Sequence, residues 1–269
     1  AQVVEVPKSF LLHPQSWTMV LHEAAHALFG ANGDVLLGGL PPSGNGADDR
    51  VEVYGNLFYH NSSGEGLIQA AGRVSIHDNV LVDASDEAVL LTSHDGFPLL
   101  RAHVYNNTVY SASRGIVFGS PAMEGDAVVG NLIFAGTPIE GGPTLEKDNI
   151  TDTVTGAMLY VASPSTTLGQ MDFYPLPGPV AGTPLDLSMF AADVAPGCDF
   201  NGASKGDRTF RGAYAGDGTN PGWKLASEIK PEVAGCGDGG GGAGGDGGAG
   251  AGGNGNGGAG AGGAGGANG

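Results

Sequence analysis

A nine-residue, strand-forming segment recurs four times in the middle of the chain, each time with an asparagine at its sixth position. The copies read VEVYGNLFY (51–59), VSIHDNVLV (74–82), AHVYNNTVY (102–110) and DAVVGNLIF (126–134). Their asparagines lie 23, 28 and 24 residues apart, and a second β-prone piece follows each of the first three copies: GLIQA (66–70), AVLLT (88–92) and GIVFG (115–119). A period of this length with two or three short strands indicates a solenoid of stacked β-coils.

The repeated asparagines have a structural role in such a solenoid. Where one strand turns into the next, the chain needs a residue that tolerates a left-handed backbone, and asparagine does so better than other non-glycine residues. Side-chain amides that stack from coil to coil also form hydrogen-bonded ladders. We therefore predict a ladder at one corner of the coils, made of Asn56, Asn79, Asn107 and Asn131.

A second pattern follows the repeats. A Pro-rich stretch leads to Asp199–Gly202, then to Arg208 or Arg211, and ends in Gly212–Tyr214. Together the two patterns resemble the right-handed parallel β-helix proteins that bacteria secrete, of the choice-of-anchor type. That family commonly has a glutamate after the final tyrosine, where this chain has Ala215. The resemblance implies an all-β fold, a right-handed single-stranded parallel β-helix, with a surface anchor after the closing segment.

The chain divides by composition. We expect an N-terminal cap or fragment edge at 1–16, β-helix coils at 17–155, an irregular closing segment at 156–235 and a disordered Gly-rich linker at 236–269. The linker has no aromatic or branched apolar residue to bury against the entropy cost of ordering. Because the chain begins without Met, either a signal peptide has been removed or the first residue is a fragment boundary.

The two cysteines, Cys198 and Cys236, come late in the chain. An even count in an acidic chain rich in Gly and Asn fits an exported protein with one disulfide, and two free thiols are the alternative.

Charge and hydropathy exclude two classes of partner. The chain has 28 Asp plus Glu against 11 Lys plus Arg, a formal net charge of −17. Nucleic-acid binding needs the opposite sign, because Lys and Arg make the phosphate contacts. No apolar run approaches the ~20 residues of a membrane span. We expect an extracellular or cell-surface monomer whose partner is a polysaccharide or a cell-envelope component.

The string His22-Glu23-Ala24-Ala25-His26 matches a zinc motif. On a helix the two histidines would share a face and bind zinc, with Glu23 as the base of a hydrolase. However, residues 19–30 align with residues 108–119 at a constant offset of 89. This alignment favours a turn between two strands, and the zinc hydrolase is a remote alternative.

Side chains alternate along a strand, so placing Val53, Ile76, Val104 and Val128 inward defines which side chains point outward. The outward columns are Tyr54, His77, Tyr105 and Val129, and beside them Glu52, Ser75, His103 and Ala127. Aromatic rings stack on sugar faces while His and Glu supply hydrogen bonds, so this strip predicts polysaccharide binding. The alternative is that the rings stack for stability alone.

A loop after the second repeat carries Asp83, Asp86 and Glu87, and Asp95 lies one loop later. Clustered carboxylates hold Ca²⁺ or act as an acid and base pair, although acidic loops are often only solvated. In a polysaccharide lyase similar to others on this fold, an arginine such as Arg73, Arg101 or Arg114 would remove the proton. We therefore weigh a non-catalytic polysaccharide-binding protein against a lyase or glycoside hydrolase that uses the acidic loop, Arg101 and Ca²⁺.

Overall fold

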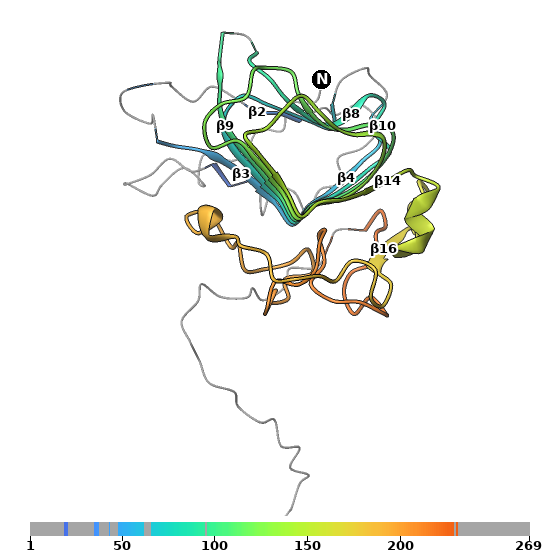
Figure 1. The fold of residues 1–269 in the computed structure, drawn as a ribbon. Coiled ribbons are helices and arrows are strands. Elements are labelled where there is room, and N and C mark those ends of the chain that lie inside the picture. Colours follow the sequence, from blue (N-terminus) through green and yellow to red (C-terminus); the bar gives the residue numbers. More distant parts are fainter. Residues whose placement is uncertain are drawn as a thin grey trace, which may run out of the picture. The chain divides into compact units, whose positions relative to one another are not determined.

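The structure is a computed structural model that describes residues 19–20, 35–37, 43, 48–61, 66–94, 96–228 and 230. These residues form a parallel β-solenoid followed by an irregular C-terminal segment (Figure 1). The solenoid confirms the predicted β-helix architecture of stacked coils.

Three strand faces build the coils. The first sheet has the order β1 (Met19–Val20), β3 (Val51–Tyr54), β6 (Gly72–His77), β9 (Leu99–Tyr105), β11 (Ala127–Val129) and β13 (Leu145–Lys147). The second face holds β4 (Leu57–Tyr59), β7 (Val80–Val82), β14 (Ile150–Asp152) and the first parts of β10 (Thr108–Phe118) and β12 (Leu132–Glu140). The third face holds β2 (Val35–Leu37), β5 (Ile68–Ala70), β8 (Glu87–Leu91) and the ends of β10 and β12. Neighbouring strands on all three faces are parallel.

The core lies inside the coils and consists of columns of apolar side chains. The inward columns are Val53, Ile76, Val104 and Val128 from the first face, Phe58, Leu81, Val109 and Ile133 from the second, and Ile68, Val89 and Ile116 from the third. Parallel strands paired in register place one such residue in each coil, so the sequence period becomes a continuous apolar core.

The asparagine ladder is present at the corner between the first and second faces. The Nδ2 group of each asparagine donates to Oδ1 of the next, at 3.1 Å from Asn56 to Asn79 and at 3.0 Å from Asn79 to Asn107 and from Asn107 to Asn131. A fifth rung, Asn149, accepts from Asn131 at 3.0 Å. From the second rung on, each Oδ1 also accepts from the backbone N–H of the preceding rung, so the amides close the corner from coil to coil.

The left-handed residue of each corner is not the asparagine, as the sequence suggested, but the residue before it. The φ angles are 72° at Gly55, 55° at Asp78, 50° at Asn106, 65° at Gly130 and 56° at Asp148. Gly, Asp and Asn are the residues that tolerate this conformation best. Because the preceding residue makes the left-handed turn, the ladder asparagine places its amide in the corner.

The C-terminal segment lies against the two faces that meet at the ladder corner (Figure 1). It contains η2 (Gly156–Leu159), β15 (Val161–Ser163), β16 (Asp172–Pro175) and η3 (Ser188–Phe190), with β15 and β16 antiparallel. Its apolar side chains cover the outer side of the second face through the cluster that includes Phe173, Phe200 and Tyr214. The segment therefore extends the core outside the coils.

The closing motif has a physical explanation in this packing. Oδ1 of Asp199 accepts from the backbone N–H of Ala203 at 2.7 Å, and its Oδ2 accepts from that of Ala215 at 3.0 Å. Residue 215 contributes its main chain to this contact, so the contact does not depend on the type of side chain at that position. Gly212 donates from its backbone to the carbonyl of Gly130 at 2.8 Å and ties the motif to the ladder corner.

Several expectations concern residues outside the described part. They are the N-terminal cap at 1–16, the His22, Glu23 and His26 motif, Asp95, Cys236 and the Gly-rich linker at 236–269. Cys198 itself is disulfide-bonded. Among the described residues, none of the helices is long and apolar enough to span a membrane.

Candidate functional site

The outer side of the first face carries three columns of side chains, as strand register places them. Tyr54, His77 and Tyr105 pair in register, and so do Glu52, Ser75 and His103, which confirms the predicted alignment of both columns. The third column was not predicted. Arg73 pairs with Arg101 in register, and Arg50 directly precedes the pair of Val51 with Val74.

The aromatic column stacks face to face but is not open to a ligand. The ring centroids lie 5.0 Å apart between Tyr54 and His77 and 4.6 Å apart between His77 and Tyr105. Phe190 of the C-terminal segment continues the stack at 4.1 Å from Tyr105. His77 and Tyr105 are 0 % exposed, so the expectation of an exposed sugar platform is wrong. The physical reason is that the apolar residues of segment 185–190 bury the outer side of Tyr105.

Buried charges surround His77. Its Nδ1 lies 2.7 Å from Oδ2 of Asp78, and its Nε2 lies 3.7 Å from Oε2 of Glu52. Burial by itself lowers the pKa of His77, but the hydrogen bond to Asp78 and the nearby carboxylate of Glu52 outweigh it, so the pKa is raised. Glu52 also pairs with Arg50. His77 and Glu52 were both predicted to bind substrate, but they are buried and contact each other and neighbouring charged side chains.

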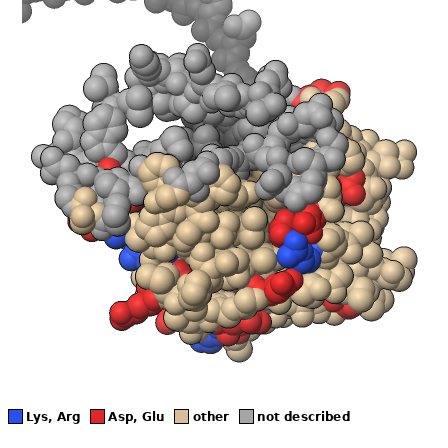
Figure 2. All heavy atoms as spheres, turned by 90° about the horizontal axis from the view of Figure 1, so that it is seen from above, with Lys and Arg blue, Asp and Glu red and all other residues tan. Residues whose placement is uncertain are grey.

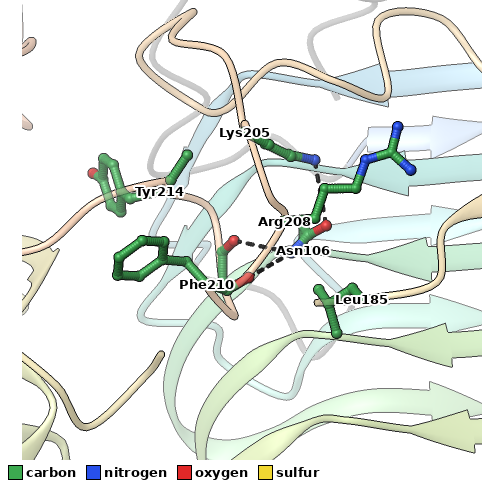
Figure 3. Close-up of a pocket in the computed structure, with 8 residues that line it drawn as sticks. Asn106, Leu185, Lys205, Arg208, Phe210 and Tyr214 are labelled. Carbon is green, nitrogen blue, oxygen red and sulfur yellow. Dashed lines mark hydrogen bonds between the residues drawn. The ribbon is translucent and has the colours of Figure 1, made fainter. Parts of the chain in front are cut away.

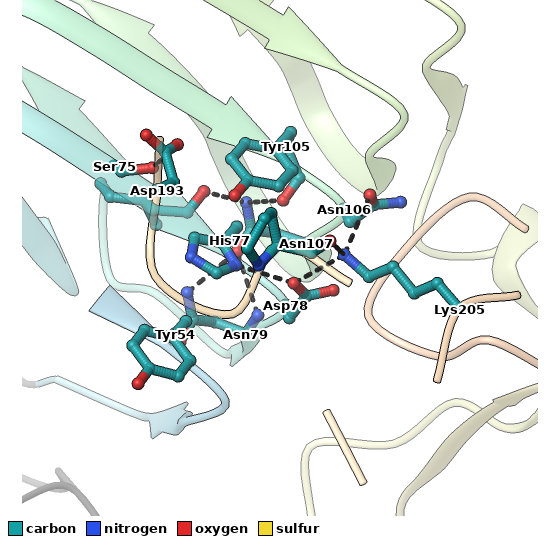
Figure 4. Close-up of polar contacts among 12 residues, drawn as sticks. Tyr54, Ser75, His77, Asp78, Asn79, Tyr105, Asn106, Asn107, Asp193 and Lys205 are labelled. Atoms are coloured by element: carbon teal, nitrogen blue, oxygen red, sulfur yellow. Dashed lines mark hydrogen bonds and ion pairs between the residues drawn. The ribbon is translucent and has the colours of Figure 1, made fainter. Parts of the chain in front are cut away.

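Asp193 attaches the C-terminal segment to the same face (Figure 4). Its Oδ2 accepts from the hydroxyl of Ser75 and lies 3.2 Å from Nδ1 of His103. Its Oδ1 lies 3.3 Å from Nη1 of Arg50. Desolvation raises the pKa of Asp193, but the bonds from His103 and Ser75 outweigh that effect and the pKa is lowered. The predicted substrate residue His103 is thus a partner of Asp193.

The acidic loop is engaged with basic side chains. Asp83 lies 2.8 Å from Nδ1 of His60, and Nη2 of Arg114 lies 2.7 Å from Asp86 and also contacts Glu87. Arg101 lies in β9 on the first face, where it pairs with Arg73, whereas Glu87 begins β8 on the third face and pairs with Arg114. The structure therefore does not bring the candidate base Arg101 to the candidate acids. Within the described residues there is also no group of three or more His, Cys, Asp or Glu that could hold a metal ion.

Arg73 and Arg101, named here the arginine pair, are different from the other basic side chains of the solenoid. Within the described residues neither guanidinium has an ion-pair partner, whereas Arg50 and Arg114 do. Nη1 of Arg73 is buried and has no hydrogen-bond partner in the part of the chain that the structure describes. Both side chains are half-buried, and the side chain of Arg101 extends over Gly125 of the next coil.

The spacing of the arginines in the sequence indicates this third column. Arg50, Arg73 and Arg101 are separated by 23 and 28 residues, the same spacings that separate the first three ladder asparagines. Figure 2 shows one face of the molecule, on which basic side chains form a few small clusters among more numerous acidic ones. Three of the 11 Lys and Arg residues of the chain therefore fall in this one column.

One small pocket lies between the ladder corner and the C-terminal segment (Figure 3). Asn106, Lys205, Arg208, Phe210, Gly212 and Tyr214 are among the residues that line it. Its volume of about 10 Å³ is comparable to the space that one water molecule occupies. The pocket is too small for a sugar ring.

The described residues define the class of protein as a parallel β-solenoid with a C-terminal segment packed along its outside. No protein-family model, no curated protein and no solved structure matches the chain.

Proposed function

We propose that this is an exported, non-catalytic binding protein that holds an acidic polysaccharide against the arginine pair. The observation that carries the proposal is the register of Arg73 with Arg101 on neighbouring strands, with no ion-pair partner for either among the described residues.

Two adjacent like charges without partners destabilise a sheet, and a buried N–H group without an acceptor costs about 1–3 kcal/mol. Both costs fall on the arginine pair, because Nη1 of Arg73 has no acceptor among the described residues. An anionic ligand removes both costs at once. Guanidinium groups bind carboxylates and sulfates in a planar, bidentate geometry that lysine does not offer.

The spacing of the column favours a polymer. Neighbouring strands lie about 4.7–4.9 Å apart, so the pair presents one guanidinium per coil along the solenoid axis. A linear polysaccharide with an acidic group on each sugar presents its charges at a similar repeat. Such a chain would lie across the strands, along the column that runs from Arg50 to Arg101, whose side chain lies over Gly125.

The contacts of the acidic loop, which was the candidate catalytic site, favour binding over catalysis. Arg114 occupies Asp86 and Glu87, so these carboxylates are held by a guanidinium rather than open to Ca²⁺ or a substrate. Export is supported by the disulfide at Cys198, because disulfides persist mainly outside the cytoplasm.

A panel of acidic and neutral polysaccharides, with and without Ca²⁺, tests this function. We expect retention on acidic polymers alone, without Ca²⁺ and without release of soluble products. The variant Asp86→Asn/Glu87→Gln should be retained like the wild type. Product release that requires Ca²⁺ and is lost in that variant would show an enzyme instead, and retention on neutral polymers only would exclude the arginine pair as the binding group.

A further inference from the structure

Three side chains meet beneath the C-terminal segment in an arrangement that no binding function explains. Nζ of Lys205 lies 2.8 Å from Oδ2 of Asp78 and 3.3 Å from Oδ1 of Asn106 (Figure 4). Asp78 and Asn106 are both 1 % exposed, and Lys205 is 7 % exposed. The ring of Tyr105 lies beside the amine, 5.5 Å from Nζ to its centroid. An amine, a carboxamide and a carboxylate are thus enclosed together away from water.

We propose that Lys205 and Asn106 form an intramolecular isopeptide bond, with Asp78 transferring the protons. The nitrogen Nζ of neutral Lys205 attacks Cγ of Asn106, the new C–N bond forms, and the bond from Cγ to Nδ2 breaks. Asp78 takes a proton from the attacking nitrogen and delivers one to the departing Nδ2. One amide replaces another and one ammonia is released, so neither an oxidant nor an activated co-substrate is required.

Each reacting group has the environment that this reaction needs. Burial lowers the pKa of Lys205, against the opposing effect of Asp78, and increases the fraction of neutral amine that can act as a nucleophile. Asp78 contacts the attacking nitrogen directly, as a group that accepts and returns a proton must. Nδ1 of His77 lies 2.7 Å from the same Asp78 oxygen, which makes His77 a positioning residue.

The leaving nitrogen is also accommodated. Nδ2 of Asn106 donates at 3.3 Å to the carbonyl of Gly130 and, more weakly, at 3.4 Å and 3.5 Å to those of Phe210 and Gly212. These contacts orient the carboxamide so that its oxygen faces Lys205 (Figure 3). Asn106 lines the small pocket, which has room for about one molecule of the size of water or ammonia.

The bond would join residues 99 positions apart, one on the ladder corner and one in the C-terminal segment. It would fasten the segment covalently to the coils beside the contact that Asp193 makes. A chain exposed outside a cell would then keep its outer layer even when the coils loosen.

Mass spectrometry of the reduced, full 269-residue chain tests the proposal. We expect the intact mass to fall short of the sequence mass by one ammonia, and a tryptic digest to yield a branched peptide that joins residues 102–114 to the peptide carrying Lys205. Asp78→Asn and Lys205→Arg should each restore the full mass. Lys230→Arg is the matched control, since the Lys230 amine is also buried but contacts backbone carbonyls of Gly55 and Phe200, and it should keep the deficit.

Two results would overturn the proposal. One is a folded wild-type chain whose reduced mass equals the sequence mass after prolonged incubation. The other is a deficit of one water with Lys205 linked to Asp78, which would make the carboxylate and not the carboxamide the reacting group. Because the wild type alone decides both, the result does not depend on whether a variant folds.

Discussion

Asp193 accepts a hydrogen bond from Ser75, a residue 118 positions earlier in the chain, and by this contact a loop of the C-terminal segment is fixed to the middle of the first face. His103 and Arg50 reach the same carboxylate from the neighbouring coils. One side chain therefore connects three coils to the layer that covers them.

Replacing the carboxylate of Asp193 should weaken the attachment of the C-terminal segment to the first face. In Asp193→Asn the ion pair with Arg50 is lost and the buried partners keep weaker bonds, so we expect the free energy of unfolding to fall by about 2–4 kcal/mol. Urea unfolding followed by circular dichroism measures the change. Asp207→Asn, at an exposed position of the same segment, should change stability by less than about 0.5 kcal/mol. Equal effects of the two variants would mean that Asp193 does not anchor the segment.

The lowered pKa of Asp193 predicts how its contribution to stability changes as the pH falls. Its pKa is lowered from 3.8 in the folded chain, so the folded state binds its proton less readily than the unfolded state does. The stabilisation is complete above the unfolded pKa and disappears as the pH falls through the folded pKa. We expect the difference in unfolding free energy between wild type and Asp193→Asn to be largest at neutral pH and to shrink below about pH 4. A difference that grows on acidification would contradict this assignment.

His77 predicts a trend in the opposite direction. Because its pKa is raised from 6.5 by Asp78 and Glu52, the folded state holds the proton more tightly than the unfolded state. This contribution is complete below the unfolded pKa and is lost as the pH rises through the folded pKa. Unfolding titrations from pH 5 to pH 9 should show a loss of stability in the wild type that is absent in His77→Phe. A wild type and variant with parallel profiles would remove His77 as the cause.

The stability lost on replacing a ladder asparagine should depend on its position in the ladder. Oδ1 of Asn107 accepts from Asn79, and its Nδ2 donates to the carbonyl of Ile76 at 2.8 Å in a fully buried corner. Asn107→Ala leaves these groups without partners, so we expect a loss of about 3 kcal/mol or more. Asn149→Ala removes the half-buried last rung and should cost about 1 kcal/mol. Thermal unfolding compares the two, and similar losses would argue against a cooperative ladder.

The coils could be predicted from the sequence because strands stacked in register need the same residue type at the same position of every coil. Asn79 and Asn107 stand out since every coil needs an amide at that corner. Asn149 was missed because it follows Asn131 by only 18 residues and its strands lack the apolar pattern of the earlier copies. The left-handed position was missed by one residue, although Gly55 and Asp78 carry the expected residue types.

The candidate site was harder to predict, because alternation separates inward from outward side chains but does not say which outward ones are covered. Tyr105 points out of the coil as expected and is nevertheless buried by Phe190. The apolar side chains of Leu185, Leu187 and Phe190 were a signal that the C-terminal segment had a surface to cover. The periodic arginines were a second signal, since their spacing matches that of the asparagines.

Titration calorimetry with a soluble acidic oligosaccharide tests the central claim most directly. We expect Arg73→Gln/Arg101→Gln to weaken binding by about tenfold or more, as the loss of hydrogen bonds to charged groups implies, and the wild-type affinity to fall as salt is added. Lys224→Gln, which removes a positive charge from an exposed position of the C-terminal segment, should bind like the wild type. A double arginine variant with unchanged affinity would contradict the proposed function.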